Sequence, residues 1–447
     1  MDKTLNMTEG RPFRLLFRFA LPLMFGNIFQ QLYTVVDTAI VGRGVGMEAL
    51  AALGSVDWLN WMLLGIVQGF TQGFSVRMSQ KFGEQDTEGL KQAVGRSAIL
   101  CIWIAILCTA LSELCLPLFL QLLRVKSSLR SDAILYSRII MGGIPVVMFF
   151  NFCSSVLRAV GDSKTPLIAM VVAALTNIVL DCIAVFGLHW GIGGAAGATV
   201  FAQCLSGLIC ARKLWATPVL RFQRIHTYPD RRLSSDLLRM GAPIAARNII
   251  IALGGMAVTS IVNGFSLAFI AGFTATGKLY GILEVAAVSY GHAITTYVGQ
   301  NYGAGRYDRI RDGMKSAVWL SILTSVVIGV AMVLFGRPIT MLFISADDAA
   351  LVAEAGNVAY YYLCTMAVFL PVLYLLFVYT FGLQGIGKTL QSMISGILEL
   401  LMRVILSAMI GYTGFEMGIF GAEIAAWIAA TVFLAITYYQ NEKKLFR

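Results

Sequence analysis

Asp37 stands near the end of an apolar run, Leu21 to Val41, that is long enough to cross a bilayer. A carboxylate at membrane depth costs several kcal/mol unless it is neutralised or partnered, so it is a functional hypothesis by default. Gln30 and Tyr33 precede Asp37 by seven and four residues, which places all three side chains on one face of a helix. This face is therefore a candidate cation-binding surface.

Three more polar residues are expected at the same depth as Asp37. Asp181 stands about six residues from the outer end of its apolar run, and Thr199 about five residues into the next run. At 1.5 Å per residue, both lie with Asp37 roughly 8 Å inside the outer boundary. Asn177 is one helical turn below Asp181. Two carboxylates, an amide and a hydroxyl suit a hard monovalent cation or a shared proton. The alternative is that each is merely hydrogen-bonded to a neighbouring group.

The second half of the chain carries its own set of polar residues inside apolar runs, namely Arg247, Asn248, Lys278, Glu284 and His292. Glu284 is expected to pair with Lys278 or Arg247, since an unpaired charge at this depth is costly. A structural ion pair and a substrate or proton relay both remain open for this set, and the lone histidine is expected to be structural. Glu399 and Arg403 have the i,i+4 spacing of a structural pair on one helix.

The composition is that of an integral membrane protein. Of the 447 residues, 58% are hydrophobic and only 13% are charged, whereas soluble domains carry about 25% charged residues. The net charge of +10 does not indicate nucleic-acid binding, because the basic residues cluster in short loops between apolar runs. The eight cysteines form no CxxC pair and are expected to be free, buried thiols.

The apolar runs predict an all-α polytopic protein with twelve transmembrane helices, since they are about 20 residues long and not alternating ten-residue strands. Of the lysines and arginines, 25 fall on the side of the N-terminus and 6 on the other side, which predicts cytoplasmic N- and C-termini. The runs are 14–42, 50–76, 93–120, 133–157, 166–187, 194–215, 240–267, 274–298, 317–342, 356–382, 390–412 and 417–439.

The chain repeats itself. Pro22 recurs as Pro243, QKFG (80–83) recurs as QNYG (300–303), and LRAVG (157–161) recurs as LQGIG (383–387). Six helices return the chain to its starting side, so the halves are expected to be related by a pseudo-two-fold axis along the membrane normal. The predicted organisation is an N-lobe over 1–215, a cytoplasmic linker over 216–239 and a C-lobe over 240–447.

Backbone features suggest where the helices bend and touch. Pro22 and Gly26 form a candidate hinge in the first helix. Gly65, Gly69 and Gly73 recur every four residues in the second run, a spacing that allows close approach of a neighbouring helix.

Over essentially its whole length the sequence resembles the MATE (multidrug and toxic compound extrusion) transporters. The stretches that carry the resemblance are LPLMFGNIFQQLYTVVDTAIVG (21–42), LRAVGDSKTP (157–166), GIGGAAGAT (191–199) and VGQNYGAG (298–305). The resemblance implies a secondary antiporter that exchanges H⁺ or Na⁺ for organic, often cationic and amphipathic, compounds.

The resemblance also implies a cation site in the N-lobe. The family's acidic residue on helix 1 matches Asp37, and the supporting positions match Gln30, Tyr33, Asn151, Asn177, Asp181 and Thr199. The NorM-type branch also uses a Glu on helix 7 and an Asp on helix 10, which correspond in this sequence to the runs 240–267 and 356–382. This sequence has neither deep in those helices, because Glu354 stands at the start of helix 10. The chain therefore looks closer to the DinF-like branch.

Two other functions are less consistent with the sequence. A flippase for lipid-linked precursors, of the same superfamily, would favour a strongly cationic cavity, and few arginines and lysines lie within the apolar runs. A membrane-embedded enzyme would need a paired metal or nucleophile motif. GLQGIGKT (382–389) matches the phosphate-binding GxxxxGK[ST] pattern but follows an apolar helix rather than a strand, so ATP is not expected.

The expected partners follow from this interpretation. They are small organic substrates and the lipid bilayer, without nucleic acid and with no cofactor beyond a coupling H⁺ or Na⁺. Function as a monomer in a bacterial inner (plasma) membrane is expected.

Overall fold

The computed structural model describes residues 5–122, 129–341, 344 and 349–445. Within these residues every regular element is a helix, and each expected apolar run coincides with one helix or with a bent pair of helices. The predicted all-α membrane fold is thus confirmed. Nine of the described helices are long and apolar enough to cross a membrane, or ten if the bent pair counts as one span.

The chain divides into two compact units, and helices α1 (Pro12–Gly44) and α8 (Arg231–Val262) each contribute to both. Unit 1 contains Leu21–Ala246, and unit 2 contains Gly10–Ala20, Arg247–Tyr302 and the chain from Arg306 onward. The other helices of unit 1 are α2 (Met47–Gly83), α3 (Thr87–Leu122), α4 (Arg130–Gly142), α5 (Ile144–Ala159), α6 (Lys164–Asp181) and α7 (Gly191–Ala216). Those of unit 2 are α9 (Leu267–Gly303), α10 (Tyr307–Met341), α11 (Ala349–Gly385), α12 (Thr389–Thr413) and α13 (Ile419–Leu445).

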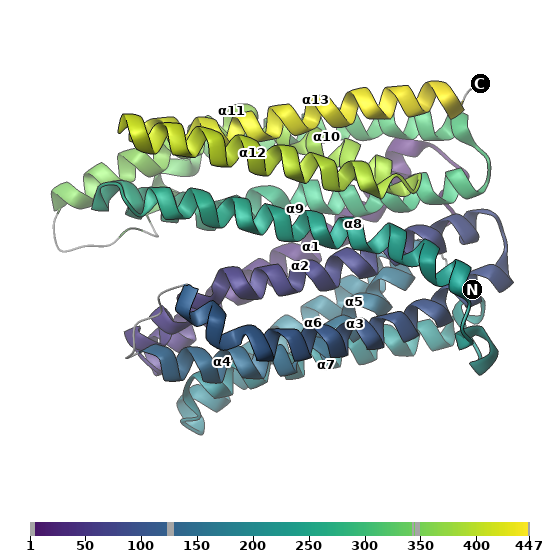
Figure 1. Cartoon of the computed structure of the whole chain (residues 1–447), viewed down its shortest axis with the longest axis horizontal. Coiled ribbons are helices and arrows are strands. Elements are labelled where there is room, and N and C mark those ends of the chain that lie inside the picture. Colours follow the sequence, from purple (N-terminus) through teal and green to yellow (C-terminus); the bar gives the residue numbers. More distant parts are fainter. Residues whose placement is uncertain (1–4, 123–128, 342–343, 345–348, 446–447) are drawn as a thin grey trace. The chain divides into compact units, whose positions relative to one another are not determined.

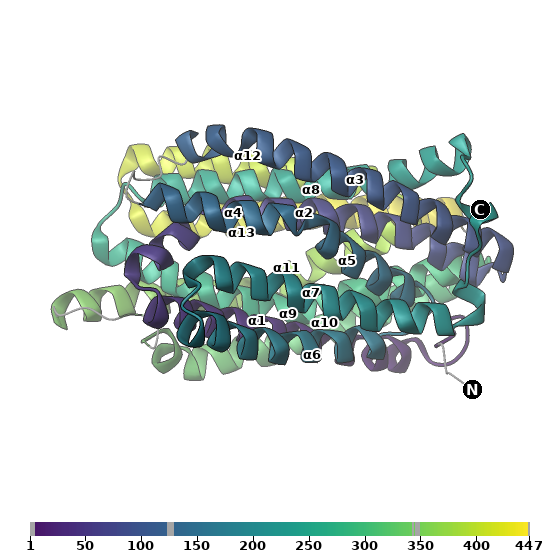
Figure 2. The ribbon, with the colours of Figure 1, turned by 90° about the horizontal axis from the view of Figure 1, so that it is seen from below.

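Within each unit the helices pack along their lengths. In unit 1, α6 and α7 run side by side (Figure 2). In unit 2, α12 and α13 form a similar pair (Figure 1). Between α7 and α8 the chain forms two short 3₁₀ turns, Pro218–Leu220 and Arg224–Thr227, and a third, Glu416–Gly418, precedes α13.

The run expected over 133–157 is a bent pair rather than one straight helix. α4 and α5 meet at Gly143 with a bend of 42°. Gly142 and Gly143 followed by Pro145 account for the bend, because adjacent glycines are flexible and proline cannot donate a backbone hydrogen bond to the preceding turn.

The second helix of each repeat is less apolar than its neighbours. α2 and α9 are not among the described helices that are long and apolar enough to cross a membrane. α2 carries Gln68 and Gln72, and α9 carries Lys278, Glu284 and His292. Polar residues on these helices are therefore expected to face the protein interior or a water-filled space rather than lipid.

The glycine stripe of α2 makes the predicted close helix contact. A Cβ atom added at Gly69 would lie 2.4 Å from the backbone of Ala245, and one added at Gly73 would lie 2.4 Å from the backbone of Gly241. Both contacts are made to α8 within unit 1. No side chain larger than hydrogen fits at either position without moving the backbone.

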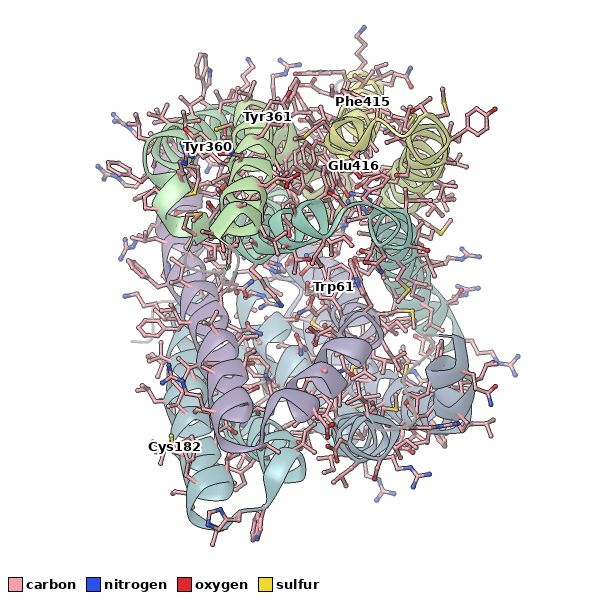
Figure 3. The ribbon with its side chains drawn as sticks, turned by 90° about the vertical axis from the view of Figure 1, so that its left-hand side faces the viewer. Trp61, Cys182, Tyr360, Tyr361, Phe415 and Glu416 are labelled. Atoms are coloured by element: carbon pink, nitrogen blue, oxygen red, sulfur yellow. The ribbon has the colours of Figure 1, made fainter. Side chains whose placement is uncertain are left out.

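The eight cysteines are all free, as predicted. Cys101, Cys153 and Cys210 are buried as expected, whereas Cys108, Cys115, Cys204 and Cys364 are only half-buried and Cys182 is exposed at the surface of unit 1 (Figure 3). This residue begins a π-helical segment, Cys182–Gly187, that continues α6.

Candidate cation site

Asp37 on α1 and Asp181 on α6 bring their carboxyl groups together in unit 1. The two groups are within hydrogen-bonding range of each other. The Asp181 side chain is fully buried, and neither of its oxygens accepts a hydrogen bond from any described residue. Oδ1 of Asp37 is also without a donor. Two facing carboxyl groups without donors require a proton or a cation between them, since a bare buried charge pair of one sign is strongly unfavourable.

Asp181 is the last residue of the α-helical part of α6, immediately before the π-helical segment. π-turns occur mostly as single turns inside α-helices and often at functional sites. The local sequence places the carboxylate at the point where the regular helical register ends.

Asn177 and Thr199, which were expected at the depth of the acidic pair, contact each other. Asn177 is buried, and its side-chain amide donates to Oγ1 of Thr199 on α7 at 3.4 Å. Thr199 in turn donates to the carbonyl of Ala195 at 3.2 Å. Oδ1 of Asn177 accepts no hydrogen bond among the described residues, so it is a fourth unpartnered oxygen available to a cation.

Tyr33 of α1 is the next residue of the candidate site. Its hydroxyl is hydrogen-bonded to the side chains of Gln30 and Gln203, and it is close enough to Asp37 to interact with its charge. Gln30, Tyr33 and Asp37 therefore share one helical face, as their spacing indicates.

A small cavity adjoins these side chains. It leaves about 10 Å³ for the centre of a water-sized sphere, about what one water molecule needs, and its lining residues are Tyr33, Ala173, Asn177, Thr199, Ala202 and Gln203. Pockets for drug-sized ligands measure about 300–1,000 Å³, so this cavity fits an ion or water rather than an organic substrate.

The hydrogen bond of the Asn151 side chain is not made to any residue of the candidate cation site. Asn151 lies on α5, and its side-chain amide donates to the carbonyl of Val147 in its own helix at 2.9 Å.

The candidate hinge residues Pro22 and Gly26 lie within α1. α1 continues as a helix through Pro22, and a Cβ atom at Gly26 would lie 3.0 Å from Sδ of Met170 on α6. Gly26 thus lets α1 approach the helix that carries Asp181.

Two residues near the site were not predicted from the sequence. Gln203 on α7 is hydrogen-bonded to Tyr33, and its position four residues after Thr199 could have revealed it. Tyr136 on α4 interacts electrostatically with both Asp37 and Asp181. No sequence signal indicated Tyr136, because its approach depends on how the bent α4–α5 pair packs.

The donor set consists only of oxygens from carboxyl, amide and hydroxyl groups. Such a set fits Na⁺, which prefers hard oxygen ligands, and it equally fits a proton shared by the two carboxyl groups. The described residues contain no group of three or more His, Cys, Asp or Glu side chains that could hold a metal ion.

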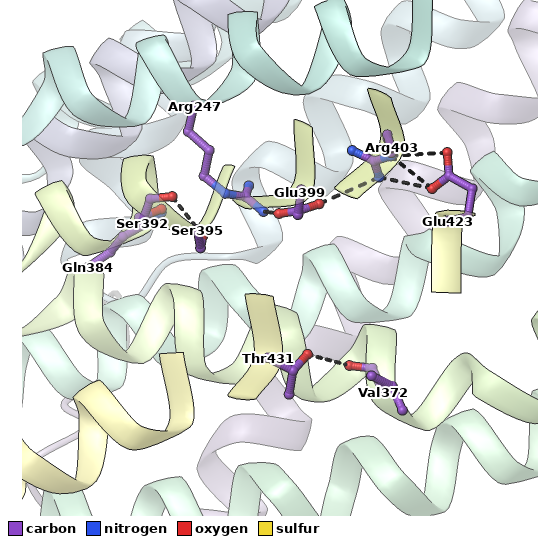
Figure 4. Close-up of polar contacts among 9 residues, drawn as sticks. All are labelled: Arg247, Val372, Gln384, Ser392, Ser395, Glu399, Arg403, Glu423 and Thr431. Atoms are coloured by element: carbon purple, nitrogen blue, oxygen red, sulfur yellow. Dashed lines mark hydrogen bonds and ion pairs between the residues drawn. The ribbon is translucent and has the colours of Figure 1, made fainter. Parts of the chain in front are cut away.

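The polar residues of unit 2 form a chain of ion pairs (Figure 4). Arg247 on α8 contacts Glu399 on α12 at 3.1 Å, and Glu399 contacts Arg403 at 3.5 Å. Arg403 then contacts Glu423 on α13 at 2.9 Å. The predicted Glu399–Arg403 pair is confirmed, and Glu423 extends it.

The expected partnership of Glu284 with Arg247 is wrong, because Arg247 is taken by Glu399. Lys278 and Glu284 form no ion pair within 4.0 Å in the described structure, and the Lys278 side chain is exposed. His292 packs edge-on against Phe381, with ring centroids 5.6 Å apart. Residues at similar depth on different helices compete for partners, and the sequence does not indicate which helices are adjacent.

Comparison with known proteins identifies the family. A profile described as MatE matches residues 22–183 and 243–409. The chain is 28% identical over 422 residues to the Probable multidrug resistance protein YpnP of Bacillus subtilis, with 93% of each chain covered. It is 24% identical over 413 residues to the Probable multidrug resistance protein NorM of Thermotoga maritima, which covers 92% of this chain and 88% of the relative.

The fold is also shared with a solved structure. An outward-facing multidrug resistance MATE family transporter of the MOP superfamily superimposes with a TM-score of 0.92 at 23% identity, over 100% of this chain and 99% of that one. Since the family profile matches most of the chain and both of its repeats, the protein belongs to the MatE family of multidrug and toxic compound extrusion transporters, and it is a membrane transporter rather than an enzyme.

Proposed function

We propose that the protein exports organic, often cationic and amphipathic, compounds in exchange for H⁺ or Na⁺, and that Asp37 and Asp181 bind the coupling ion. The observation that carries this proposal is the pair of facing carboxyl groups, with no donor on either oxygen of Asp181. The names of the relatives, which are multidrug resistance proteins, support the substrate class.

The coupling follows from where the two carboxyl groups stand. Asp37 belongs to α1 and Asp181 to α6, so a cation between them links the two helices. When the cation leaves, the carboxylates repel each other and α1 is driven from α6. An ion shifts a conformational equilibrium only by its difference in affinity for the two states. We propose that Pro22 and Gly26 let α1 move, and that Gln30, Tyr33, Asn177 and Thr199 orient the acidic pair, with Asn151 in a supporting position.

The two lobes over 1–215 and 240–447 are proposed to alternate access to the two sides of the membrane, with the linker 216–239 on the cytoplasmic side. We further propose a DinF-like rather than NorM-like assignment, because α8 lacks an acidic residue from Arg247 to its end and Glu354 lies in the first two turns of α11. A bacterial plasma membrane with both termini cytoplasmic fits the charge distribution of the loops and the bacterial relatives. We propose that a single chain suffices for transport.

A flippase for lipid-linked precursors is the alternative within the superfamily. Such substrates carry phosphates and need unneutralised cationic groups. In unit 2 the buried arginines Arg247 and Arg403 are each paired with a glutamate. This neutralisation favours export of cationic compounds over anionic lipids.

The test is transport of a cationic fluorescent dye by the reconstituted protein under an imposed pH or Na⁺ gradient. The wild type should move the dye with one of the two gradients, and Asp37→Asn should lose gradient-driven movement by at least about tenfold, since the amide cannot load the ion. Glu113→Gln is the matched control, because Glu113 pairs only with the exposed Arg138 on the surface. Unchanged ion-driven movement by Asp37→Asn, with normal insertion, would sink the assignment.

A further inference from the structure

The ion-pair chain of unit 2 has no net charge. Arg247 and Arg403 supply two positive charges, and Glu399 and Glu423 supply two negative charges. Their side chains are between 3% and 15% exposed, so water contributes little to their neutralisation. Buried ion pairs of this kind persist when each charge has a partner and further hydrogen bonds satisfy the remaining atoms.

Glu284 adds a fifth ionisable group to this closed set. It lies on α9 and makes no ion pair within 4.0 Å with any described residue, although it interacts with the charges of Arg403, Glu423 and Glu399. Its carboxyl group accepts a hydrogen bond from the hydroxyl of Tyr280, one turn earlier on the same helix. Tyr374 of α11, whose hydroxyl donates to the carbonyl of Leu283 at 2.9 Å, also interacts with its charge. If Glu284 is ionised, the cluster has a net charge of −1 among buried helices.

One buried hydrogen-bond donor of the cluster has no acceptor among the described residues. Nη1 of Arg403 has no hydrogen-bond partner in the described structure, although its Nε and Nη2 both contact Glu423. A charged donor without an acceptor in the interior is strongly unfavourable, so the structure favours a state in which an acceptor reaches it. Glu284 is the carboxyl group near Arg403 that has no salt-bridge partner of its own.

We infer that Glu284 is a second proton-binding group of the transport cycle, which accepts the hydrogen bond of Tyr280 while it is protonated and, once deprotonated, moves to Nη1 of Arg403. The proton leaves Oε of Glu284 for bulk water, no other bond is broken, and the resulting carboxylate replaces the missing acceptor of Arg403. The inference rests on the proposed cation-coupled transport and adds a coupling group in unit 2 to the pair in unit 1.

A proton fits this position better than Na⁺ does. A metal cation needs several oxygen ligands, whereas the neighbouring carboxylates Glu399 and Glu423 are already engaged by arginines. The guanidinium of Arg403 repels a metal ion, whereas it attracts the carboxylate that remains once a proton has left Glu284. A proton requires only one oxygen and no coordination shell.

The switch would change the contact between helices. In the protonated state Glu284 is bonded within α9, and in the deprotonated state it ties α9 to Arg403 of α12. Tyr280 stacks on the buried Trp427 of α13, with ring centroids 6.1 Å apart, so release of its hydroxyl is transmitted to α13. The protonation of one carboxyl group therefore alters the packing of three helices.

The experiment is infrared difference spectroscopy of the reconstituted protein through a pH step, which detects the C=O stretch of protonated carboxylic acids without requiring transport. Wild type should show a band that is lost in Glu284→Gln and kept in Asp37→Asn. Tyr280→Phe should shift that band, because it removes only the hydrogen bond to the carboxyl group, and it serves if Glu284→Gln does not fold. Glu113→Gln, a surface carboxyl variant, should leave the spectrum unchanged.

Proton counting supplies the second measurement. The number of protons moved per dye molecule should fall by one in Glu284→Gln. A spectrum that keeps every band in Glu284→Gln, or that does not shift in Tyr280→Phe, would overturn the inference. Loss of the Glu284 band together with normal transport in Asp37→Asn would instead contradict the proposed role of the unit 1 pair, so the two failures are distinguishable.

Discussion

The carboxyl groups of Asp37 and Asp181 face each other across α1 and α6, and no described residue donates a hydrogen bond to either oxygen of Asp181. A structural role would normally provide donors for buried acceptors, since more than nine-tenths of such groups are satisfied in folded proteins. The arrangement therefore lowers the stability of the fold unless a cation or a proton binds between the two carboxyl groups.

Asp181→Asn should stabilise the protein while abolishing coupling. The amide removes one of two facing charges and can donate to Asp37, so the free energy of unfolding should rise by about 1–3 kcal/mol. Thermal unfolding in detergent should show a higher midpoint, and gradient-driven dye transport should be lost. A lower midpoint would mean that the ionised pair is held by donors outside the described contacts.

Glu399→Gln should be among the most destabilising single changes in unit 2. Glu399 bridges Arg247 and Arg403, so its neutralisation leaves two buried guanidinium groups short of countercharge, at a cost of about 3–5 kcal/mol. The control is Arg138→Gln, which breaks the exposed pair with Glu113 and should cost less than about 1 kcal/mol. Thermal or denaturant unfolding of both variants measures the difference, and equal effects would contradict the buried network.

The sequence predicts the axial position of polar groups better than their lateral neighbours. Asp37, Asp181, Asn177 and Thr199 could be brought to one level because a transmembrane helix rises by a fixed 1.5 Å per residue. The i,i+4 pair Glu399–Arg403 and the shared face of Gln30 and Asp37 follow from helical periodicity within a single element.

What the sequence does not provide is the choice among helices at the same depth. Glu284 was expected beside Arg247, but Glu399 of α12 forms the ion pair with Arg247 instead. Glu423 finds Arg403 only because α13 runs along α12. Tyr136 approaches Asp37 through the packing of the α4–α5 pair, whose 42° bend no hydrophobic pattern displays.

Gly73→Ala should weaken unit 1. The added Cβ would lie 2.4 Å from Cα of Gly241, so α2 and α8 must move apart, and overpacking of this kind costs about 1–3 kcal/mol. Gly54→Ala is the matched control in the same helix, because nothing lies within 4 Å of its added Cβ. The unfolding midpoint should fall only for Gly73→Ala, and a shared shift would point to helix propensity rather than to the close contact.

The turn after α2 should contribute a small acid-sensitive term. The Lys81 ammonium group, with the backbone N–H of Gly89, lowers the pKa of Asp86. A lowered folded-state pKa gives stability that is present above the unfolded value of about 3.9 and lost as the pH falls through the folded value. Because the Asp86 side chain is 39% exposed, solvent screening keeps the effect below about 1 kcal/mol. In Asp86→Asn the free energy of unfolding should depend less on pH than in the wild type, and only below about pH 4. A difference in pH dependence near neutral pH would contradict the assignment to Asp86.

Gln203→Met should weaken binding of the coupling ion without preventing folding. Gln203 holds the hydroxyl of Tyr33 and lines the small cavity beside Asn177, so its loss frees Tyr33 to rotate away from Asp37. Losing one hydrogen bond of about 1 kcal/mol predicts a roughly fivefold rise in the half-saturating ion concentration for transport, with little change in maximal rate. Thr38→Val is the control on α1, because its hydroxyl donates only to the carbonyl of Thr34 in its own helix. If Gln203→Met lowered the maximal rate and left the half-saturating concentration unchanged, Gln203 would act on the movement of α7 rather than on the ion.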